Sequence, residues 1–294
     1  MKKKIILDTD IGSDIDDSIC LAYLLAQPEC DLLGITTVSG EPDKRAMMAS
    51  AMCKVAGKAG IPVYAGAEMP LITPQKQPHA SQAKVLDKWE HETNFPKGDA
   101  IEFMRQTIRA NPNEVTLLAI GPMTNVAQLF SVDPEIPSLL KELVLMCGVF
   151  TYKLSPYTCL CEWNALCDPY ATAIVYNAPV KNIRSIGLDV TTQVTMTRDE
   201  VMEKFTAKVL QPVRDFSGVW FEGAGTITFH DPLAAAVIFD DSICKFERGD
   251  VDVELQSDKT KGMTYFRHNE NGKNEVAFTV DRDRFFDHYF DIVK

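Results

Sequence analysis

The sequence has 294 residues and carries 30 Lys and Arg against 41 Asp and Glu, a formal net charge of −11 at pH 7. Hydrophobic residues make up 46% of it, a globular proportion that argues against disordered, collagen-like and coiled-coil chains. The acidic balance argues against wide nucleic-acid binding, which needs Lys and Arg to replace phosphate counterions. A chain of this length buries roughly 75% of its unfolded surface, enough for a full hydrophobic core.

Targeting and redox signals are weak in this sequence. Only three apolar residues separate the basic segment Met1 to Lys4 from Asp8, too few for a signal peptide. The longest uncharged run contains glycine, proline and asparagine, which is not typical of a membrane span. We therefore expect a cytoplasmic protein with no membrane contact and with reduced cysteines. The spacing of Cys159, Cys161 and Cys167 is not that of a zinc site, so most of the eight cysteines are expected to be buried apolar groups.

Short apolar runs alternate with helical patterns along the chain. In chain order they predict a strand at Lys4–Asp8, a helix at Asp17–Leu25, a strand at Leu32–Val38, a helix at Asp43–Ala59, a short strand at Val63–Ala65, a helix at Ala100–Ala110, a strand at Val115–Ile120, a helix at Asn125–Phe130, a strand within Leu139–Cys147, a helix at Pro169–Tyr176 and a strand at Ile183–Leu188. This alternation predicts an α/β fold with an open, mostly parallel sheet flanked by helices. The region from Val251 to Val280 is rich in β-formers and turns, which indicates an antiparallel edge. With no repeat or long linker, residues 1–294 are expected to form one domain.

Acidic side chains gather where the first predicted strand ends, the edge at which open parallel sheets bind ligands. Five carboxylates fall within ten residues, at Asp8, Asp10, Asp14, Asp16 and Asp17. Burying like charges this close together is costly unless a cation compensates them. A hard divalent cation such as Ca²⁺, which takes oxygen ligands, is the simplest solution. The plain alternative is a solvated loop that caps the next helix, because Asp is favourable at a helix N-terminus.

Two known acidic motifs fit this loop badly. An EF-hand needs Gly at loop position six and Glu at twelve, whereas counting from Asp8 places Ser13 and Ile19 there. A haloacid-dehalogenase-type phosphatase expects Thr or Val two residues after the second Asp, where this chain has Gly12. A phosphatase therefore stays a minor alternative.

Polar groups also follow later predicted strands. Glu162 and Asn164 flank Trp163, an arrangement suited to holding sugar hydroxyls with the ring against the apolar face of the sugar, although a surface loop is the plain alternative. His230 and Asp231 open an apolar helix, where Asp231 is either an N-cap or a metal ligand beside an acid.

Taken in order, these motifs resemble those of the inosine–uridine-preferring nucleoside hydrolases. The N-terminal signature has the form Asp8-Thr-Asp10-Ile-Gly12 followed by Asp16-Asp17. Supporting segments are Gly34–Val38, Pro62–Gly66, Ile120–Asn125, Glu162–Asn164 with Asp168-Pro169, Gly187–Thr191 and His230–Pro232. The resemblance runs from the first strand to the helix after His230. It implies an open, mainly parallel α/β sheet and an enzyme of nucleoside salvage that is usually a homodimer or homotetramer.

The resemblance also implies a Ca²⁺ at the bottom of the pocket and a role for each site residue. The implied metal ligands are Asp10, Asp17, the backbone carbonyl of Ile120, and Asp231. The implied substrate-binding residues are Asp16, Glu162, Trp163 and Asn164. Two further candidates come from the residues themselves: Glu41, which could bind a hydroxyl or a cation, and His79, whose polar loop could cover a pocket. Asp10 is the implied general base that takes a proton from water, and His230 is the implied acid that protonates the leaving base.

The sequence departs from the family pattern at several positions. Ser13, Asp14 and Ile15 lie between Gly12 and the Asp pair, two residues more than usual, so Asp14 competes with Asp16 for a role. Glu41 stands where an Asn is common, Pro156 stands where another Asn is common, and a His-Gly loop motif is reduced to His79-Ala80. These changes leave base preference open, together with any role of Cys159 and Cys161.

The function that we expect is Ca²⁺-dependent hydrolysis of ribonucleosides to ribose and a free base. One alternative keeps the reaction but changes the substrate to a modified nucleoside or another N-ribosyl compound. Another is a Ca²⁺-dependent nucleoside- or sugar-binding protein without turnover, for which neither a base nor an acid is needed.

Overall fold

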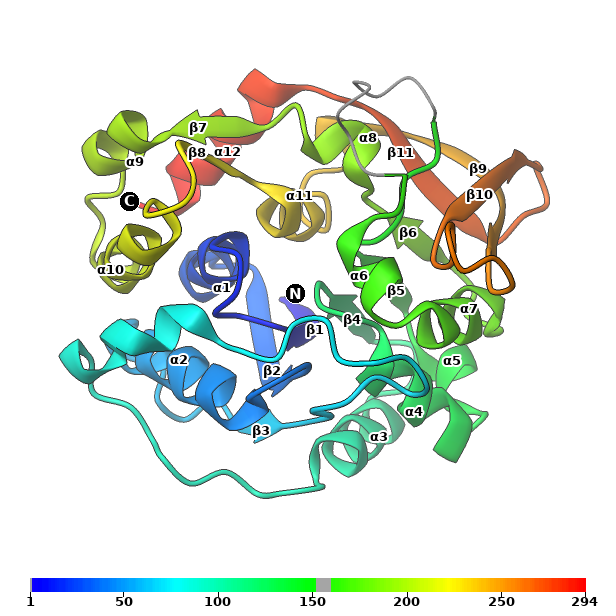
Figure 1. Cartoon of the computed structure of the whole chain (residues 1–294), viewed down its shortest axis with the longest axis horizontal. Coiled ribbons are helices and arrows are strands. Elements are labelled where there is room, and N and C mark those ends of the chain that lie inside the picture. Colours follow the sequence, from blue (N-terminus) through cyan, green and yellow to red (C-terminus); the bar gives the residue numbers. More distant parts are fainter. Residues whose placement is uncertain (1, 152–159) are drawn as a thin grey trace.

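A computed structural model describes residues 2–151 and 160–294 of the chain. The described residues contain a nine-stranded sheet in the order β10-β9-β11-β6-β5-β4-β1-β2-β3 (Figure 1). Its strands are β1 Lys3–Thr9, β2 Cys30–Thr37, β3 Val63–Ala65, β4 Val115–Ala119, β5 Glu142–Leu145, β6 Ile183–Ser185, β9 Cys244–Val253, β10 Thr264–His268 and β11 Asn274–Val280. The run from β3 to β11 is parallel, whereas β9 and β10 add an antiparallel edge.

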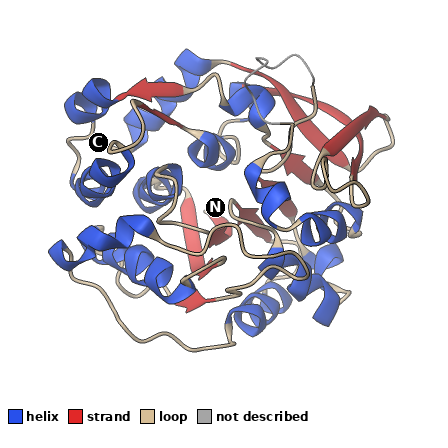
Figure 2. Ribbon diagram, viewed as in Figure 1, coloured by secondary structure: helices blue, strands red, loops and turns tan. Residues whose placement is uncertain are grey.

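Helices cover both faces of this sheet (Figure 2). They are α1 Asp16–Ala26, α2 Pro42–Val55, α3 Ala100–Ala110, α4 Thr124–Val132, α5 Ile136–Leu139, α6 Trp163–Cys167, α7 Pro169–Asn177, α8 Leu188–Thr191, α9 Arg198–Lys204, α10 Gln211–Trp220, α11 His230–Ala236 and α12 Arg282–Ile292, with 3₁₀ turns η1 Ser81–Lys88, η2 Lys208–Leu210 and η3 Asp241–Ile243. A two-stranded antiparallel sheet, β7 Thr195–Thr197 with β8 Thr226–Thr228, lies beside them.

Alternate side chains of the strand β1 pack into two different hydrophobic clusters. Ile5 and Leu7 belong to the apolar cluster that includes α1, α2, α11 and α12, whereas Ile6 belongs to the cluster that includes α3, α4 and α7. Successive side chains of a strand point to opposite faces, so a strand covered on both sides is apolar throughout. The run of buried residues in β1 follows from this central position.

The order of the strands fixes where a ligand binds. The chain moves from β1 through β2 to β3 on one side, and then returns to place β4 on the other side of β1. Such a switch point leaves a crevice outside the carboxyl ends of the two central strands. The loops after β1 and β4, which carry the acidic motif and Ile120, therefore meet at one place.

The expected parallel sheet and its antiparallel C-terminal edge are confirmed, but several boundaries differ. The helix expected at Asp43–Ala59 ends at Val55, because Gly57 adopts φ +70° and its N–H bonds back to the Lys54 carbonyl. The strand expected within Leu139–Cys147 is confined to Glu142–Leu145, since the preceding residues form α5. No prediction was made for β7, β8 and the helices α9, α10 and α12.

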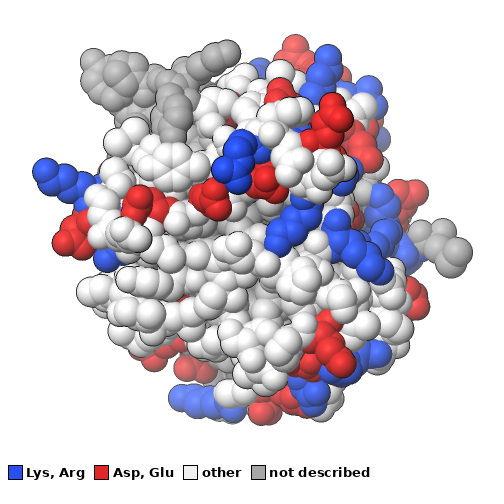
Figure 3. All heavy atoms as spheres, turned by 90° about the vertical axis from the view of Figure 1, so that its right-hand side faces the viewer, with Lys and Arg blue, Asp and Glu red and all other residues white. Residues whose placement is uncertain are grey.

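The cysteines, the helices and the surface charge of the described residues complete the picture of the fold. The seven cysteines in the described ranges are all buried, whereas Cys159 lies outside them. No helix among the described residues is long and apolar enough to cross a membrane. On the face shown in Figure 3, charged side chains of both signs are interspersed around a broad uncharged area.

Candidate active site

A cavity of about 590 Å³ opens at the carboxyl ends of the central strands. Its walls come from the acidic loop after β1, the segment before η1, the N-terminal turn of α6 and the N-terminal turn of α11. Every candidate site residue except Glu41 lines it, namely Asp10, Asp16, Asp17, His79, Ile120, Glu162, Trp163, Asn164, His230 and Asp231. The topology thus brings together residues that lie more than 200 positions apart in the sequence.

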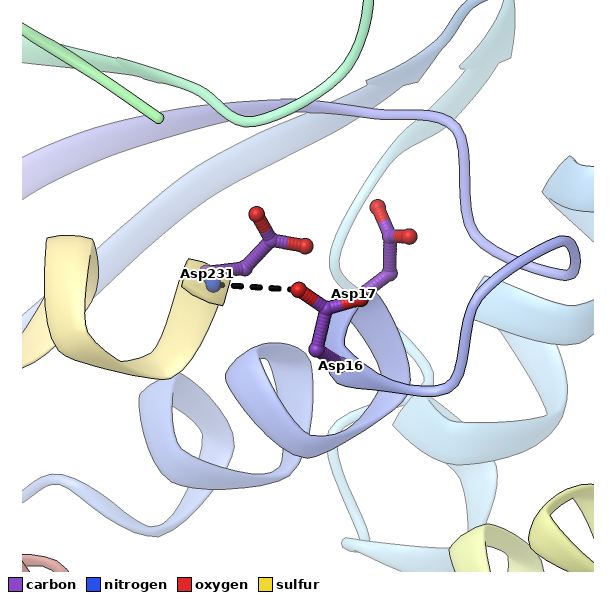
Figure 4. Close-up of side chains that lie close together, drawn as sticks. All are labelled: Asp16, Asp17 and Asp231. Carbon is purple, nitrogen blue, oxygen red and sulfur yellow. Dashed lines mark hydrogen bonds between the residues drawn. The ribbon is translucent and has the colours of Figure 1, made fainter. Parts of the chain in front are cut away.

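Three buried carboxylates form the floor of the cavity (Figure 4). Asp16 and Asp17 open α1, and Asp231 stands in the first turn of α11. One oxygen from each lies within 4.8 Å of the others, and no more than 4% of any of the three residues is exposed. The backbone N–H of Asp231 donates to Asp16 Oδ2 at 3.2 Å, so the two helix ends are joined directly.

The electrostatics of this group favour a cation. Burial raises the pKa of Asp16, Asp17 and Asp231 well above the usual range, and neighbouring carboxylates raise it further. A positive ion between the three oxygens would replace the protons that these pKa values favour. The side-chain atoms available to bind such an ion are all oxygens, which suit a hard ion such as Ca²⁺ or Mg²⁺ rather than a thiophilic one. The residues present therefore fit a divalent metal.

Asp10 and Ile120, the other expected ligands, line the same cavity but lie outside the close group of three. Asp10 Oδ2 accepts a hydrogen bond from Gln77 Nε2. Burial raises the pKa of Asp10, while the nearby Arg45 and the bond from Gln77 lower it. The loop after β4 approaches Asp10 closely because Gly121 has no side chain: a Cβ there would lie 2.9 Å from Asp10 Oδ1.

A buried arginine holds the acidic loop from below. Arg45 on α2 is 0% exposed, and its guanidinium donates to the carbonyls of Asp10, Ile11 (3.1 Å) and Gly40 (2.8 Å) and to Ser13 Oγ (3.0 Å). Its Nη2 has no hydrogen-bond partner among the described residues. Arg45 is thus both an anchor for the loop backbone and a positive charge that acts on Asp10 and Asp17.

The sugar-binding candidates are tied into the backbone around the cavity. Glu162 caps α6, and its carboxylate accepts the N–H groups of Asn164 (2.6 Å), Ala165 (3.0 Å) and Gly148 (3.1 Å). The side-chain amide of Asn164 donates to the carbonyls of Ile120 (2.7 Å) and Met146 (3.0 Å). Both side chains therefore fix loop geometry in addition to facing the cavity.

Aromatic and imidazole groups stand around the upper part of the cavity. Trp163 is 47% exposed, and its indole Nε1 donates to Gln77 Oε1 at 2.5 Å. His230 Nδ1 lies 2.6 Å from Thr191 Oγ1, and burial lowers the pKa of His230 to about 4. His230 is therefore neutral at pH 7 in the ligand-free protein. The side chain of His79 is 73% exposed at the mouth.

The structure does not bring Glu41 to the cavity. Glu41 adopts a left-handed backbone conformation with φ +57°, and its carboxylate pairs with Lys44 Nζ at 2.6 Å. The other carboxylate oxygen accepts the backbone N–H of Ala80 at 3.0 Å. In this position Glu41 holds the loop before η1 and lies 3.9 Å from Nδ1 of the cavity residue His79.

Other positions that the sequence left open have mixed outcomes. Asp14 lines the cavity, where burial raises its pKa to about 6, so it remains beside Asp16 near the metal group. Cys161 lines the cavity too, with its sulfur 3.8 Å from the carbonyl oxygens of Thr260 and Lys261. Cys159 and Pro156 lie outside the described residues.

Gln77, Trp220 and Arg45 are among the residues at this site that the sequence did not single out. Gln77 and Trp220 line the cavity from a loop and from the end of α10. Arg45 left a signal in the sequence, because it falls in helical register with Met48, Ala49 and Met52, which are all buried. A lone arginine on an apolar helix face indicates a buried acceptor set.

A sequence profile described as "Inosine-uridine preferring nucleoside hydrolase" matches residues 5–287. This chain belongs to that family. The nucleoside hydrolase is 33% identical to the inosine-uridine preferring nucleoside hydrolase of Leishmania major over 306 residues, covering 97% of this chain and 96% of the relative. It is 31% identical to the pyrimidine-specific ribonucleoside hydrolase RihA of Shewanella sp. (strain MR-7), covering 98% of this chain and 95% of the relative.

Solved structures agree with this assignment of the nucleoside hydrolase. The purine-preferring ribonucleoside hydrolase from Gardnerella vaginalis superposes with a TM-score of 0.86 at 25% identity, covering 99% of this chain and 98% of the other. A plant nucleoside hydrolase shares the fold with a TM-score of 0.84 at 23% identity. As a member of this family, the chain is a hydrolase of N-glycosyl bonds.

Proposed function

We propose that this nucleoside hydrolase uses Ca²⁺ to split the N-glycosidic bond of ribonucleosides, giving ribose and a free base. The observation that carries the proposal is the buried group of Asp16, Asp17 and Asp231 on the floor of a cavity with aromatic walls. Carboxylates and a cation suit the polyhydroxylated sugar, the Trp163 ring suits its apolar face, and Trp220 suits a flat base. The ion would be held by Asp17 and Asp231 of this group, with Asp10 and the Ile120 carbonyl from the same cavity lining as further ligands, while Asp16 is left to the sugar. When bound, the ion supplies a charge that orients a diol and acidifies water.

The residues of the chain account for the remaining chemistry. The bond from C1′ to the base nitrogen breaks as positive charge develops on the ribose, and fixed carboxylates around the sugar stabilise that charge. Asp10 takes the proton of the water whose oxygen joins C1′. Asp16, Glu162 and Asn164 hold the ribose hydroxyls.

His230 serves the leaving base in this proposal. With Nδ1 accepting from the Thr191 hydroxyl, its Nε2 carries the proton and donates to the base nitrogen. The lowered pKa keeps the imidazole of His230 neutral in the ligand-free protein, so the ring gives the departing nitrogen a hydrogen bond from Nε2. Full proton transfer needs the imidazolium form, which the negative charge developing on the leaving base favours.

Two variants test this division of roles. Asp10→Ala and His230→Ala are each expected to lower kcat at least 10²-fold while nucleoside binding persists. If the wild type binds nucleosides without turnover, and both variants bind as tightly, the protein is a binding protein and the proposal is wrong. An unchanged kcat in either variant would remove that residue from the mechanism.

The proposal also includes features that the resemblance implied. We place the enzyme in the cytoplasm, as a homodimer or homotetramer acting in nucleoside salvage. Light scattering of the purified protein measures the assembly directly, and a monomer would contradict that part.

A further inference from the structure

We propose that Gln77 is a positioning residue that sets the Asp10 carboxylate and the Trp163 ring relative to each other. This inference rests on the proposed function, because Asp10 is the candidate base and Trp163 the candidate sugar platform. Gln77 lies on the loop between β3 and η1, is 8% exposed, and lines the cavity between those two residues.

The hydrogen bonds leave only one orientation for the Gln77 amide. An indole N–H can only donate, so the bond of 2.5 Å from Trp163 Nε1 must end on the amide oxygen, Gln77 Oε1. The amide nitrogen, Nε2, is then the group that meets Asp10 Oδ2, and an ionised carboxylate can only accept. Donor and acceptor types match along the whole chain from indole to amide to carboxylate.

The loop that carries Gln77 is itself fixed in place. The backbone N–H of Gln77 donates to Gln75 Oε1 at 2.8 Å, and Ser39 Oγ, two residues after β2, lies 3.3 Å from the same oxygen. The side chain of Gln77 is therefore held from behind while its amide faces the cavity. A residue that only closed the loop would need the backbone bond but not the two bonds of the amide.

Two consequences follow for the site. Oδ2 of Asp10 accepts the amide N–H, which fixes the orientation of the carboxylate and with it the place of Oδ1. The Trp163 ring, although 47% exposed, is restrained at its nitrogen by the bond to Gln77. Loss of the amide would release both groups at once, and a shift of about 1 Å in a reacting group is enough to cost roughly 10²-fold in rate.

A double-mutant cycle tests the coupling. Gln77→Met keeps the length of the side chain without its hydrogen bonds, and Trp163→Phe keeps an aromatic ring without the donor. We expect Gln77→Met to lower kcat 10- to 100-fold with KM changed less than 3-fold, and the double variant to be no slower than Gln77→Met alone. Gln106→Met and Trp89→Phe, at an exposed glutamine and at a tryptophan that bonds Asp215 away from the cavity, are the matched controls.

A Ca²⁺ titration gives a readout that needs no turnover. It uses the metal-stripped wild type, Gln77→Met, Trp163→Phe and the double variant. We expect Gln77→Met to weaken Ca²⁺ binding about 3- to 10-fold. Adding Trp163→Phe to Gln77→Met should weaken Ca²⁺ binding no further. The proposal would be overturned if the effects of Gln77→Met and Trp163→Phe multiplied in the double variant, both for kcat and for Ca²⁺ affinity. It would also be overturned if Gln77→Met had the same kcat and the same Ca²⁺ affinity as the wild type. A wild type that never releases ribose refutes the proposed function instead, and the Ca²⁺ cycle then decides on Gln77 alone.

Discussion

Replacing Arg45 with methionine should destabilise the protein strongly, because its guanidinium is the anchor of the acidic loop. Methionine keeps the buried aliphatic volume but donates no hydrogen bond. Four acceptors lose their donor, namely the carbonyls of Asp10, Ile11 and Gly40 and the Ser13 hydroxyl. Hydrogen bonds from a charged donor contribute about 1.5–3 kcal/mol each. Removing the guanidinium also removes the free-energy cost of burying its charge, which offsets part of this loss.

The net loss is set by these opposing contributions. Removing one partner from a buried charged network typically costs about 3–5 kcal/mol, and the unsatisfied Nη2 places Arg45 at the lower end. We therefore expect a fall of about 3 kcal/mol in the free energy of unfolding, or roughly 5 °C in Tm for a chain of 294 residues. Urea unfolding followed by circular dichroism measures it. Arg267→Met, whose side chain is 72% exposed, is the matched control and should change stability by less than about 0.5 kcal/mol. A loss below about 1 kcal/mol for Arg45→Met would refute the anchoring role.

Two further predictions concern the metal and His230. Ca²⁺ at 100 times its Kd should stabilise the chelator-stripped protein by about 2.7 kcal/mol in thermal melts, and Asp17→Asn should abolish that gain, whereas an equal gain in the variant would place the ion elsewhere. His230 has a lowered pKa in the folded protein, so the unfolded chain binds the extra proton, and the contribution of His230 to stability is present above about pH 6.5 and is lost as the pH falls toward 4. Relative to His230→Gln, the wild type should therefore lose at most about 1.4 kcal/mol per pH unit across that window, and parallel stability curves for the two proteins would contradict the burial of a neutral imidazole.

The parts of the site that could be predicted from sequence are those fixed by the ends of secondary-structure elements. Asp16 and Asp17 begin a helix after the first strand, and Asp231 begins another, so the topology of the sheet alone brings them together. Ile120 follows the same rule at the end of β4. These positions depend on where strands end and helices begin, which the periodicity of the sequence indicates, whereas the order of the strands came from the structure.

The parts that could not be predicted depend on loop conformation. Gln77 reaches Asp10 only because the loop between β3 and η1 folds over the cavity, and no periodic pattern records that path. Glu41 was expected near the substrate, yet its left-handed backbone conformation, with φ +57°, accompanies a side chain turned toward Lys44. Arg45 was predictable in principle, because a charge on a buried helix face needs acceptors.

Release of reducing sugar from a panel of purine and pyrimidine ribonucleosides tests the central claim most directly. The purified enzyme would be assayed after chelation and again after Ca²⁺ is restored. The account predicts ribose release that disappears on chelation and returns with Ca²⁺, and the ranking of the panel would give the base preference. Ribose release that is indifferent to chelation would contradict the role of the buried Asp16, Asp17 and Asp231 group, and no release from any nucleoside would contradict the proposed substrate class.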